Sequence, residues 1–93
     1  MSQIHQFGLF LRKVHPKDMK AYYADINTEV VSRLRALRKS KRLSQKDLAE
    51  LLGETQAYVS RVERQERRLD VAEFLLWCKA LSVDPSLMLP KID

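Results

Sequence analysis

Few residues of this 93-residue sequence have the types and spacing that catalysis requires. The one cysteine, Cys78, lies among apolar residues, which favours a buried small side chain over a reactive thiol and excludes a zinc site built from cysteines. The two histidines, His5 and His15, are ten positions apart and have no acidic partner at ligand spacing. The sequence shows no nucleophile paired with a base and no phosphate-binding loop. We therefore expect no enzyme, no metal site and no cofactor.

The chemistry that the sequence does offer is positive charge. Seventeen Lys and Arg against twelve Asp and Glu give a formal net charge of +5, the sign expected for a polyanionic partner. Six cations and no acid stand between positions 33 and 42: Arg33, Arg35, Arg38, Lys39, Lys41 and Arg42. Cations near a helix C-terminus also complement its dipole. We interpret this run as a favourable surface rather than a second binding site.

The most informative segment runs from Gln45 to Val62, QKDLAELLGETQAYVSRV. It predicts two short helices joined by a turn, in which Gly53 takes the left-handed conformation at the lowest cost. Ala49, four residues before that glycine, provides the small side chain that a close helix crossing needs. The apolar residues that must then point together into the core are Leu48, Leu52, Val59 and Val62. These constraints are those of a helix-turn-helix motif.

Helix caps predict the elements that position this motif. Thr28 is expected to cap a first helix, Ser44 a second, with Asp47 completing a capping box, and Thr55 a third. Gly53 ends the second helix. The side chains expected to face inward are Val30, Val31, Leu34 and Leu37 on the first helix, Leu48, Ala49, Leu51 and Leu52 on the second, and Val59 and Val62 on the third.

Two further helices are predicted after the motif. Asp70 is expected to cap a fourth helix, and Asp84-Pro85 to open a fifth, Ser86–Leu89, which Pro90 closes. The inward side chains of the fourth helix are expected to be Val71, Phe74, Leu75, Cys78 and Leu81. Two glycines and three prolines are few for a turn-rich β fold. We therefore expect an all-α domain of five helices with an N-terminal extension.

The extension is predicted to be residues 1–27, and the domain residues 28–93. Alternation between Phe7 and Leu11 is compatible with a short strand, and Pro16 is well placed to open a helix that carries Met19, Tyr22 and Tyr23. We interpret this arm as either a packing extension or a dimerisation element.

Residues 28–89 resemble the phage-repressor/Cro-type helix-turn-helix family, also called the XRE family of bacterial transcriptional regulators. The resemblance runs through LRALRKSKRLSQKDLAELLGETQAYVSRVERQER and DVAEFLLWCKALSVDPSLML, about two-thirds of the chain. It implies a repressor-like domain of five helices that inserts its third helix, residues 55–63, into the major groove of double-stranded DNA as a two-fold dimer.

The resemblance also implies the contacts. Gln45, at the start of the second helix, would bind a phosphate with help from the free helix amides. Gln56 would pair with adenine, Arg61 with guanine, and the methyl group of Ala57 would touch a thymine methyl. The groove-facing residues would be Thr55, Gln56, Ala57, Tyr58, Ser60 and Arg61, and the phosphate-binding arginines Arg64, Arg67 and Arg68. For Tyr58, surface packing and DNA contact remain equal alternatives.

Two matched positions and two departures bear on the structure of the site. Arg38 and Glu63 match a family pair that forms a salt bridge between the first and third helices, a structural role. Many members carry Gly or Asn at the position of Arg42, and Gly at the position of Gln65. The second departure leaves open the turn after the recognition helix, and with it the roles of the arginines that follow.

The expected function is sequence-specific regulation of transcription by a homodimer, with Leu87–Leu89 and the apolar arm Phe7–Leu11 as candidate seams. The alternative is an antitoxin-type module that binds a partner protein through the arm or the fourth helix. The sequence lacks the stacked aromatic residues of a platform for single-stranded RNA. It also lacks a secretory signal and an apolar run of the about 18–20 residues that a membrane span needs. We therefore expect a cytoplasmic protein without membrane contact.

Overall fold

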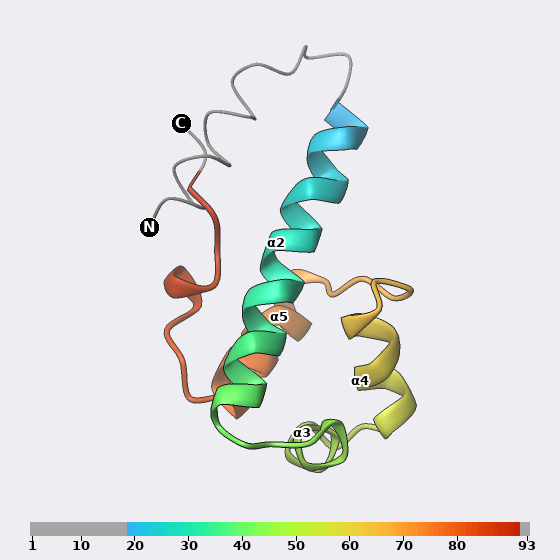
Figure 1. The fold of residues 1–93 in the computed structure, drawn as a ribbon, viewed down its shortest axis with the longest axis vertical. Helices are drawn as coiled ribbons and strands as arrows, with labels where there is room; N and C mark the ends of the chain where they lie inside the picture. The colour runs from blue at the N-terminus through green and yellow to red at the C-terminus, as the bar shows by residue number, and fades with distance from the viewer. Residues whose placement is uncertain (1–18, 92–93) are drawn as a thin grey trace.

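The computed structural model describes residues 19–91, and this part of the chain is entirely helical (Figure 1). It contains four α-helices and one short 3-10 helix: α2 (Met19–Ser40), α3 (Gln45–Leu52), α4 (Gln56–Glu63), α5 (Val71–Ala80) and η2 (Pro85–Leu87). The helix α2 is the longest element, α3 lies at its C-terminal end, and α4 lies beside it (Figure 1). The predicted all-α class is confirmed.

The start of the first described helix differs from the prediction. No helix begins at Thr28, because α2 continues from Met19 through this residue to Ser40. The Thr28 hydroxyl donates to the carbonyl of Ala24, one turn earlier, at 2.9 Å. Threonine makes this local bond in a helix interior, so its side chain alone does not mark a cap. The boundary predicted between residues 27 and 28 therefore falls inside a helix.

The predictions for the arm lie mostly outside the described residues. This holds for the strand at Phe7–Leu11 and for the helix start at Pro16. Within the described part, Met19, Tyr22 and Tyr23 do lie on the first turns of α2. The role of the arm in packing or dimerisation stays a prediction.

The helix-turn-helix forms as the sequence predicts. The Ser44 hydroxyl accepts a hydrogen bond from the Asp47 amide at 2.9 Å, and the Asp47 carboxylate accepts one from the Ser44 amide at 2.9 Å, which completes the capping box of α3. Gly53 ends α3 with φ +69°. The Thr55 hydroxyl then caps α4 by accepting from the Tyr58 amide at 3.1 Å. Local hydrogen bonds and the left-handed glycine thus fix where α3 begins and ends and where α4 begins.

The core lies where α2, α3, α4 and α5 meet. Its buried residues are Leu34, Leu48, Ala49, Val59, Val62, Trp77, Cys78 and Leu81. Trp77 is the largest of these side chains, although the sequence pattern had not placed it among the inward residues of its helix. Burial raises the pKa of the Cys78 thiol, which agrees with the predicted inert role of this cysteine.

Three side chains predicted to face inward are exposed instead. Leu51 is 59% exposed because α3 packs through Leu48, Ala49 and Leu52, and a helix turns about 100° per residue, which directs position 51 away from that stripe. Leu75 is 47% exposed because α5 packs through Trp77 and Cys78, and the turn of the helix directs position 75 away from them. Val71, the first residue of α5, is 77% exposed. An apolar residue at a helix end has fewer neighbours to cover it.

The fifth predicted helix is a 3-10 turn rather than an α-helix. Asp84 caps it by accepting a hydrogen bond from the Ser86 amide at 3.0 Å, and the turn ends at Leu87. Arg33 on α2 fastens this segment by donating to the carbonyls of Leu87 and Leu89, at 3.3 and 3.2 Å. Tertiary contacts thus hold the C-terminal segment where the sequence suggested a longer helix.

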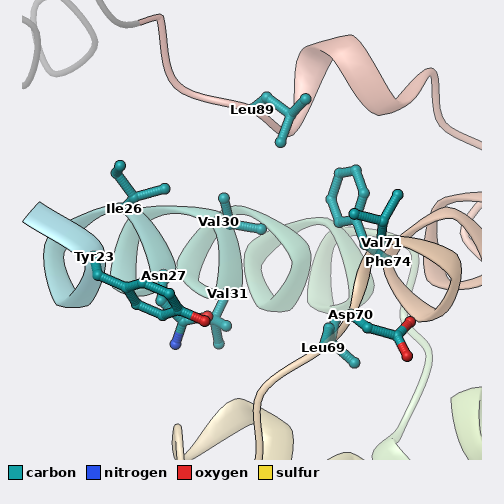
Figure 2. Close-up of a pocket in the computed structure, with 10 residues that line it drawn as sticks. All are labelled: Tyr23, Ile26, Asn27, Val30, Val31, Leu69, Asp70, Val71, Phe74 and Leu89. Carbon is teal, nitrogen blue, oxygen red and sulfur yellow. The ribbon is translucent and has the colours of Figure 1, made fainter. Parts of the chain in front are cut away.

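An apolar hollow of about 260 Å³ lies between the first half of α2 and the start of α5 (Figure 2). Phe74 and Val71 form one side, and Leu89 closes it from the C-terminal segment. The other residues that line it are Tyr23, Ile26, Asn27, Val30, Val31, Leu69 and Asp70. Across residues 19–91, no helix has the length and apolar character needed to cross a membrane.

Candidate nucleic-acid interface

The exposed face of α4 follows from how its other face is buried. Val59 and Val62 are completely buried against α2, α3 and α5. The helix must therefore present its remaining positions to solvent. The exposed residues on this face are Thr55, Gln56, Ala57 and Arg61, while Tyr58 and Ser60 are half-buried.

Arg61 is exposed in the last turn of α4. Its guanidinium makes no hydrogen bond or ion pair with another residue of the described chain. All five N–H donors of this group are therefore available to a ligand. Because the helix beneath it is anchored by two buried valines, the side chain projects from a rigid base.

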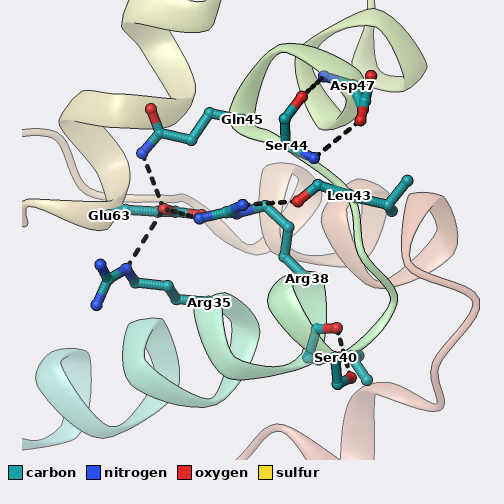
Figure 3. A network of polar contacts seen from close by, with 9 residues as sticks. Arg35, Arg38, Ser40, Leu43, Ser44, Gln45, Asp47 and Glu63 are labelled. Atoms are coloured by element: carbon teal, nitrogen blue, oxygen red, sulfur yellow. Dashed lines mark hydrogen bonds and ion pairs between the residues drawn. The ribbon is translucent and has the colours of Figure 1, made fainter.

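Glu63, at the end of α4, is the centre of a buried polar network (Figure 3). Arg38 on α2 donates from Nε to Oε2 at 2.6 Å and from Nη2 to Oε1 at 2.9 Å. A third donor of Arg38 binds the carbonyl of Leu43 at 2.7 Å. The side chains of Arg38 and Glu63 are only 8% and 2% exposed. The structural role predicted for this pair is confirmed.

Gln45 joins the same network from the first turn of α3. Its Nε2 donates to Oε1 of Glu63 at 3.0 Å, and Nε of Arg35 approaches the same oxygen at 3.7 Å (Figure 3). An amide nitrogen carries two N–H donors, so one remains for a phosphate. The sequence pattern did not reveal this link, because it joins two helices across the motif.

The start of α3 combines free amides with one acid. The backbone amide and the hydroxyl of Ser44, in that order, hold the pKa of the Asp47 carboxyl below its ordinary value. The capping box uses the amides of Ser44 and Asp47, whereas those of Gln45 and Lys46 have no partner within the helix. A phosphate at this end would therefore meet the second amide donor of Gln45 and two backbone amides.

The basic loop, residues 64–70 between α4 and α5, holds its three arginines in different ways. Arg64 forms a two-point pair with Glu66, at 3.1 Å for both contacts. Arg67 forms another with Glu73 at 3.0 and 2.7 Å, and this pairing is the main reason that the pKa of Glu73 is lowered. The guanidinium of Arg68 lies over the ring of Tyr23, 4.1 Å from its centre.

Tyr58 has a packing role in this structure. Its hydroxyl accepts a hydrogen bond from Nε1 of Trp77 at 3.1 Å, and the two rings meet edge to face at 6.2 Å. The guanidinium of Arg67 covers the tyrosine ring at 5.0 Å from its centre. Burial is the largest cause that raises the pKa of the Tyr58 hydroxyl. Of the two alternatives for Tyr58, the structure shows packing, and a DNA contact stays a prediction.

The two residues that depart from the family pattern both adopt the left-handed backbone conformation, although neither is glycine. Arg42 has φ +59° and Gln65 has φ +61°. After α4, the Gln65 amide donates to the Val62 carbonyl at 2.9 Å and the Glu66 amide to the Arg61 carbonyl at 2.8 Å. The Gln65 side-chain oxygen also lies 2.8 Å from the Thr28 hydroxyl, whose single proton is shared between this oxygen and the Ala24 carbonyl. The turn after the recognition helix therefore forms without glycine, because Gln65 takes the left-handed conformation and a contact with Thr28 on α2 stabilises it.

The described residues hold no cluster of His, Cys, Asp and Glu that could bind a metal ion, and both histidines lie outside them. The arrangement that remains is two short capped helices, the second with an exposed face of amides and arginine, beside a basic loop. This arrangement defines a helix-turn-helix DNA-binding domain.

Comparison with known proteins agrees with this class. A helix-turn-helix family model matches residues 34–88. The chain is 32% identical over 72 residues to the control protein C.SmaI of Serratia marcescens, a match that covers 76% of this chain and 86% of that protein. The chain belongs to the XRE-type helix-turn-helix family.

Solved structures show the same fold. An XRE-family-like protein from Pseudomonas syringae pv. tomato superimposes with a TM-score of 0.73 at 34% identity, covering 76% of this chain and 87% of that one. The restriction-modification controller protein C.AhdI of Aeromonas hydrophila gives 0.65 at 39% identity, covering 72% of this chain and all of that one. The chain is therefore a DNA-binding transcription regulator, in a family of regulators rather than of enzymes.

Proposed function

We propose that this regulator reads a specific sequence in the major groove of double-stranded DNA with the exposed face of residues 55–63. The observation that carries the proposal is the contrast on α4 between two buried valines and the unpaired, exposed Arg61. A rigid helix that presents amide and guanidinium donors matches the hydrogen-bonding pattern of base edges. Gln56 and Ala57 share the exposed face with this arginine.

Base contacts and phosphate contacts divide between the elements. Arg61 and Gln56 contact base edges, because they project from the exposed face of the recognition helix, Arg61 in its last turn and Gln56 at its start. Gln45 contacts a phosphate at the start of α3, where the neighbouring helix amides are available. Thr55 and Ser60 support the contact at the edges of this face.

We further propose that the chain binds DNA as a homodimer. One recognition helix reads only a few base pairs, and two related helices reach successive major grooves about 34 Å apart. Apolar side chains are exposed on α5 and on the C-terminal segment: Val71, Leu75, Leu76, Leu87 and Leu89. A surface of this kind supports a seam that includes the segment predicted at Leu87–Leu89, and a second copy would remove it from water.

Selection of bound duplexes from a random pool tests the reading mode. We expect the selected duplexes to share a short element in two copies related by two-fold symmetry, with centres about one helical turn apart. Sedimentation of the saturated complex should then show two chains per duplex. A selected pool without a common element would contradict sequence-specific reading, and one chain per high-affinity site would contradict the dimer.

A partner-protein module is the second candidate, because the apolar hollow beside α5 offers a surface unrelated to α4. The similarity to proteins named as control and controller proteins favours the regulator. Affinity purification of the chain followed by mass spectrometry separates the two. A protein recovered in equal amount with the chain, and lost when Phe74→Asp alters the hollow, would support the second candidate.

A further inference from the structure

We propose that Arg68 is the phosphate-binding arginine of the basic loop and that Tyr23 on α2 positions it. The proposal rests on the DNA-binding function proposed above. It assigns the phosphate contact to one of the three arginines that the sequence could not distinguish. It also gives a function to the first turns of α2, which precede residues 34–88, the part of the chain that the family model matches.

The other two arginines of the loop are already engaged by carboxylates. Arg64 uses two donors on Glu66, and Arg67 uses two on Glu73. Arg67 also donates to the Arg68 carbonyl at 2.7 Å, which fixes the backbone of its neighbour. For either of them to bind a phosphate with the same donors, an existing two-point ion pair must first open.

Arg68 differs from them in what it contacts. Its guanidinium is stacked on an aromatic face, and among the described residues it makes no hydrogen bond or ion pair. A stack covers one face of the planar group and leaves the N–H donors at its edge available. The positive charge is thus held in place without being neutralised, an arrangement that suits a phosphate oxygen.

The loop is held against the same side of α2 at a second point. The Gln65 side-chain oxygen lies 2.8 Å from the Thr28 hydroxyl and accepts from the Asn27 amide at 3.5 Å. Tyr23 and Asn27 are four residues apart, so they lie on one face of the helix, and Figure 2 shows both projecting from the same side of α2. This face therefore sets both the strained turn at Gln65 and the position of Arg68.

The test compares charge variants in binding titrations on the duplex selected above and on a scrambled duplex, at several salt concentrations. Arg68→Ala should weaken both duplexes by a similar factor. It should also make the negative slope of log K against log salt shallower by about 0.9, the value for one phosphate contact. The matched control is Lys79→Ala, which removes one exposed positive charge from the last turn of α5, where no DNA contact is proposed. This control should retain the parental slope and an affinity within about twofold of the parent.

Tyr23 variants test the positioning role. Tyr23→Leu should weaken both duplexes by about two- to fivefold, the fold-change that corresponds to an exposed cation–π contact. Tyr23→Phe retains the ring and should match the parent. In the Arg68→Ala background, Tyr23→Leu should have no further effect, because the group that it positions is absent. Both side chains are exposed, so thermal melts of these variants should stay close to the parent.

The outcomes separate this proposal from the one on which it rests. An unchanged salt slope in Arg68→Ala would overturn the phosphate contact, and a Tyr23→Leu loss that persists without Arg68 would overturn the positioning role. Weakening by Tyr23→Phe equal to that by Tyr23→Leu would also contradict it. Arg61→Ala in the same titrations reports on groove reading independently. A parent chain that binds neither duplex would overturn both proposals.

Discussion

Two arginine–glutamate pairs connect elements around the recognition helix and differ in burial. Arg38 and Glu63 are 8% and 2% exposed, and they join α2 to the end of α4. Arg67 and Glu73 are 41% and 24% exposed, and they join the basic loop to the start of α5. Both are two-point contacts of nearly equal length. Chemistry and geometry alone therefore do not decide what such a pair contributes.

The difference lies in what happens when each pair is broken. A charge left alone in the core loses both its partner and its hydration, whereas an exposed charge regains water. We therefore infer that the inner pair fixes where α4 stands, and that the outer pair tunes a loop at little cost in stability. A regulator needs the first to be permanent, since α4 carries the proposed base contacts.

The largest expected effect comes from breaking the inner pair. Glu63→Ala leaves Arg38 buried without its carboxylate and also removes the acceptor of Gln45. We expect a loss of about 3–5 kcal/mol in the free energy of unfolding, measured by urea titration. The double variant Arg38→Met with Glu63→Leu should lose much less than Glu63→Ala, because no buried charge is left alone. Equal losses in the two variants would show that the network is not effectively buried.

Two leucines of α3 sharpen the same contrast between buried and exposed positions. Leu48→Ala should lower the free energy of unfolding by about 2–5 kcal/mol, because it leaves a cavity in the buried core between the helices. Leu51→Ala, three residues later and 59% exposed, should change it by less than about 0.5 kcal/mol. Thermal melts of both variants measure this. A similar loss in both would contradict the face that α3 buries.

A contact to DNA is expected to cost less than the inner network. Arg61→Ala should weaken binding to the selected duplex by about 1–3 kcal/mol and relax preference at one position of each half-site. Its unfolding curve should match the parent, because the side chain is exposed and unpaired. Equal weakening on selected and scrambled duplexes would instead make Arg61 a backbone contact.

The smallest effect is expected at the outer pair. Glu73→Gln keeps the amide acceptor at the third position of α5 but removes the charge that Arg67 binds, so the loss at neutral pH should stay below about 1 kcal/mol. Because the pKa of Glu73 is lowered in the folded state, its contribution is present above the ordinary glutamate value of 4.5 and is lost as the pH falls through the lower folded value.

Urea titrations of this variant and the parent between pH 7 and pH 3 check the sign. The parent should lose stability more steeply than Glu73→Gln below about pH 4.5, because the Glu73 carboxylate takes up a proton in the unfolded chain at a higher pH than in the folded chain. Parallel curves would show that the pairing of Glu73 adds nothing to the folded state.

Much of the candidate site could be predicted because its determinants are local. Ser44, Thr55 and Asp70 cap helices with their own side chains. Gly53 takes the left-handed conformation that the turn after α3 requires. These bonds span three or four residues, so the residue types reveal them. The buried stripe of α4 follows from the spacing of Val59 and Val62.

Other features could not be predicted, because they depend on neighbours distant in sequence. Thr28 has the side chain of a cap but lies in the middle of α2. Val71 and Leu75 are apolar at helical spacing, yet no element covers them within residues 19–91. Trp77 is the largest buried side chain, and its packing partners lie on other helices, Tyr58 among them. A periodic pattern shows which residues share a face, and only packing shows how far that face is covered.

The sequence by itself determined the helix-turn-helix and its family, because capping, turn chemistry and apolar spacing act within single helices and all agree in one short segment. Only the tertiary structure decided how the three arginines of the basic loop differ, since the pair of Arg38 with Glu63 already followed from the family resemblance. Arg38, Arg64, Arg67 and Arg68 have the same side chain, and each is joined to a different partner by the fold: Glu63, Glu66, Glu73 and the ring of Tyr23. A guanidinium takes its role from its burial and its partner, and for three of these four the partner lies on another element of the fold.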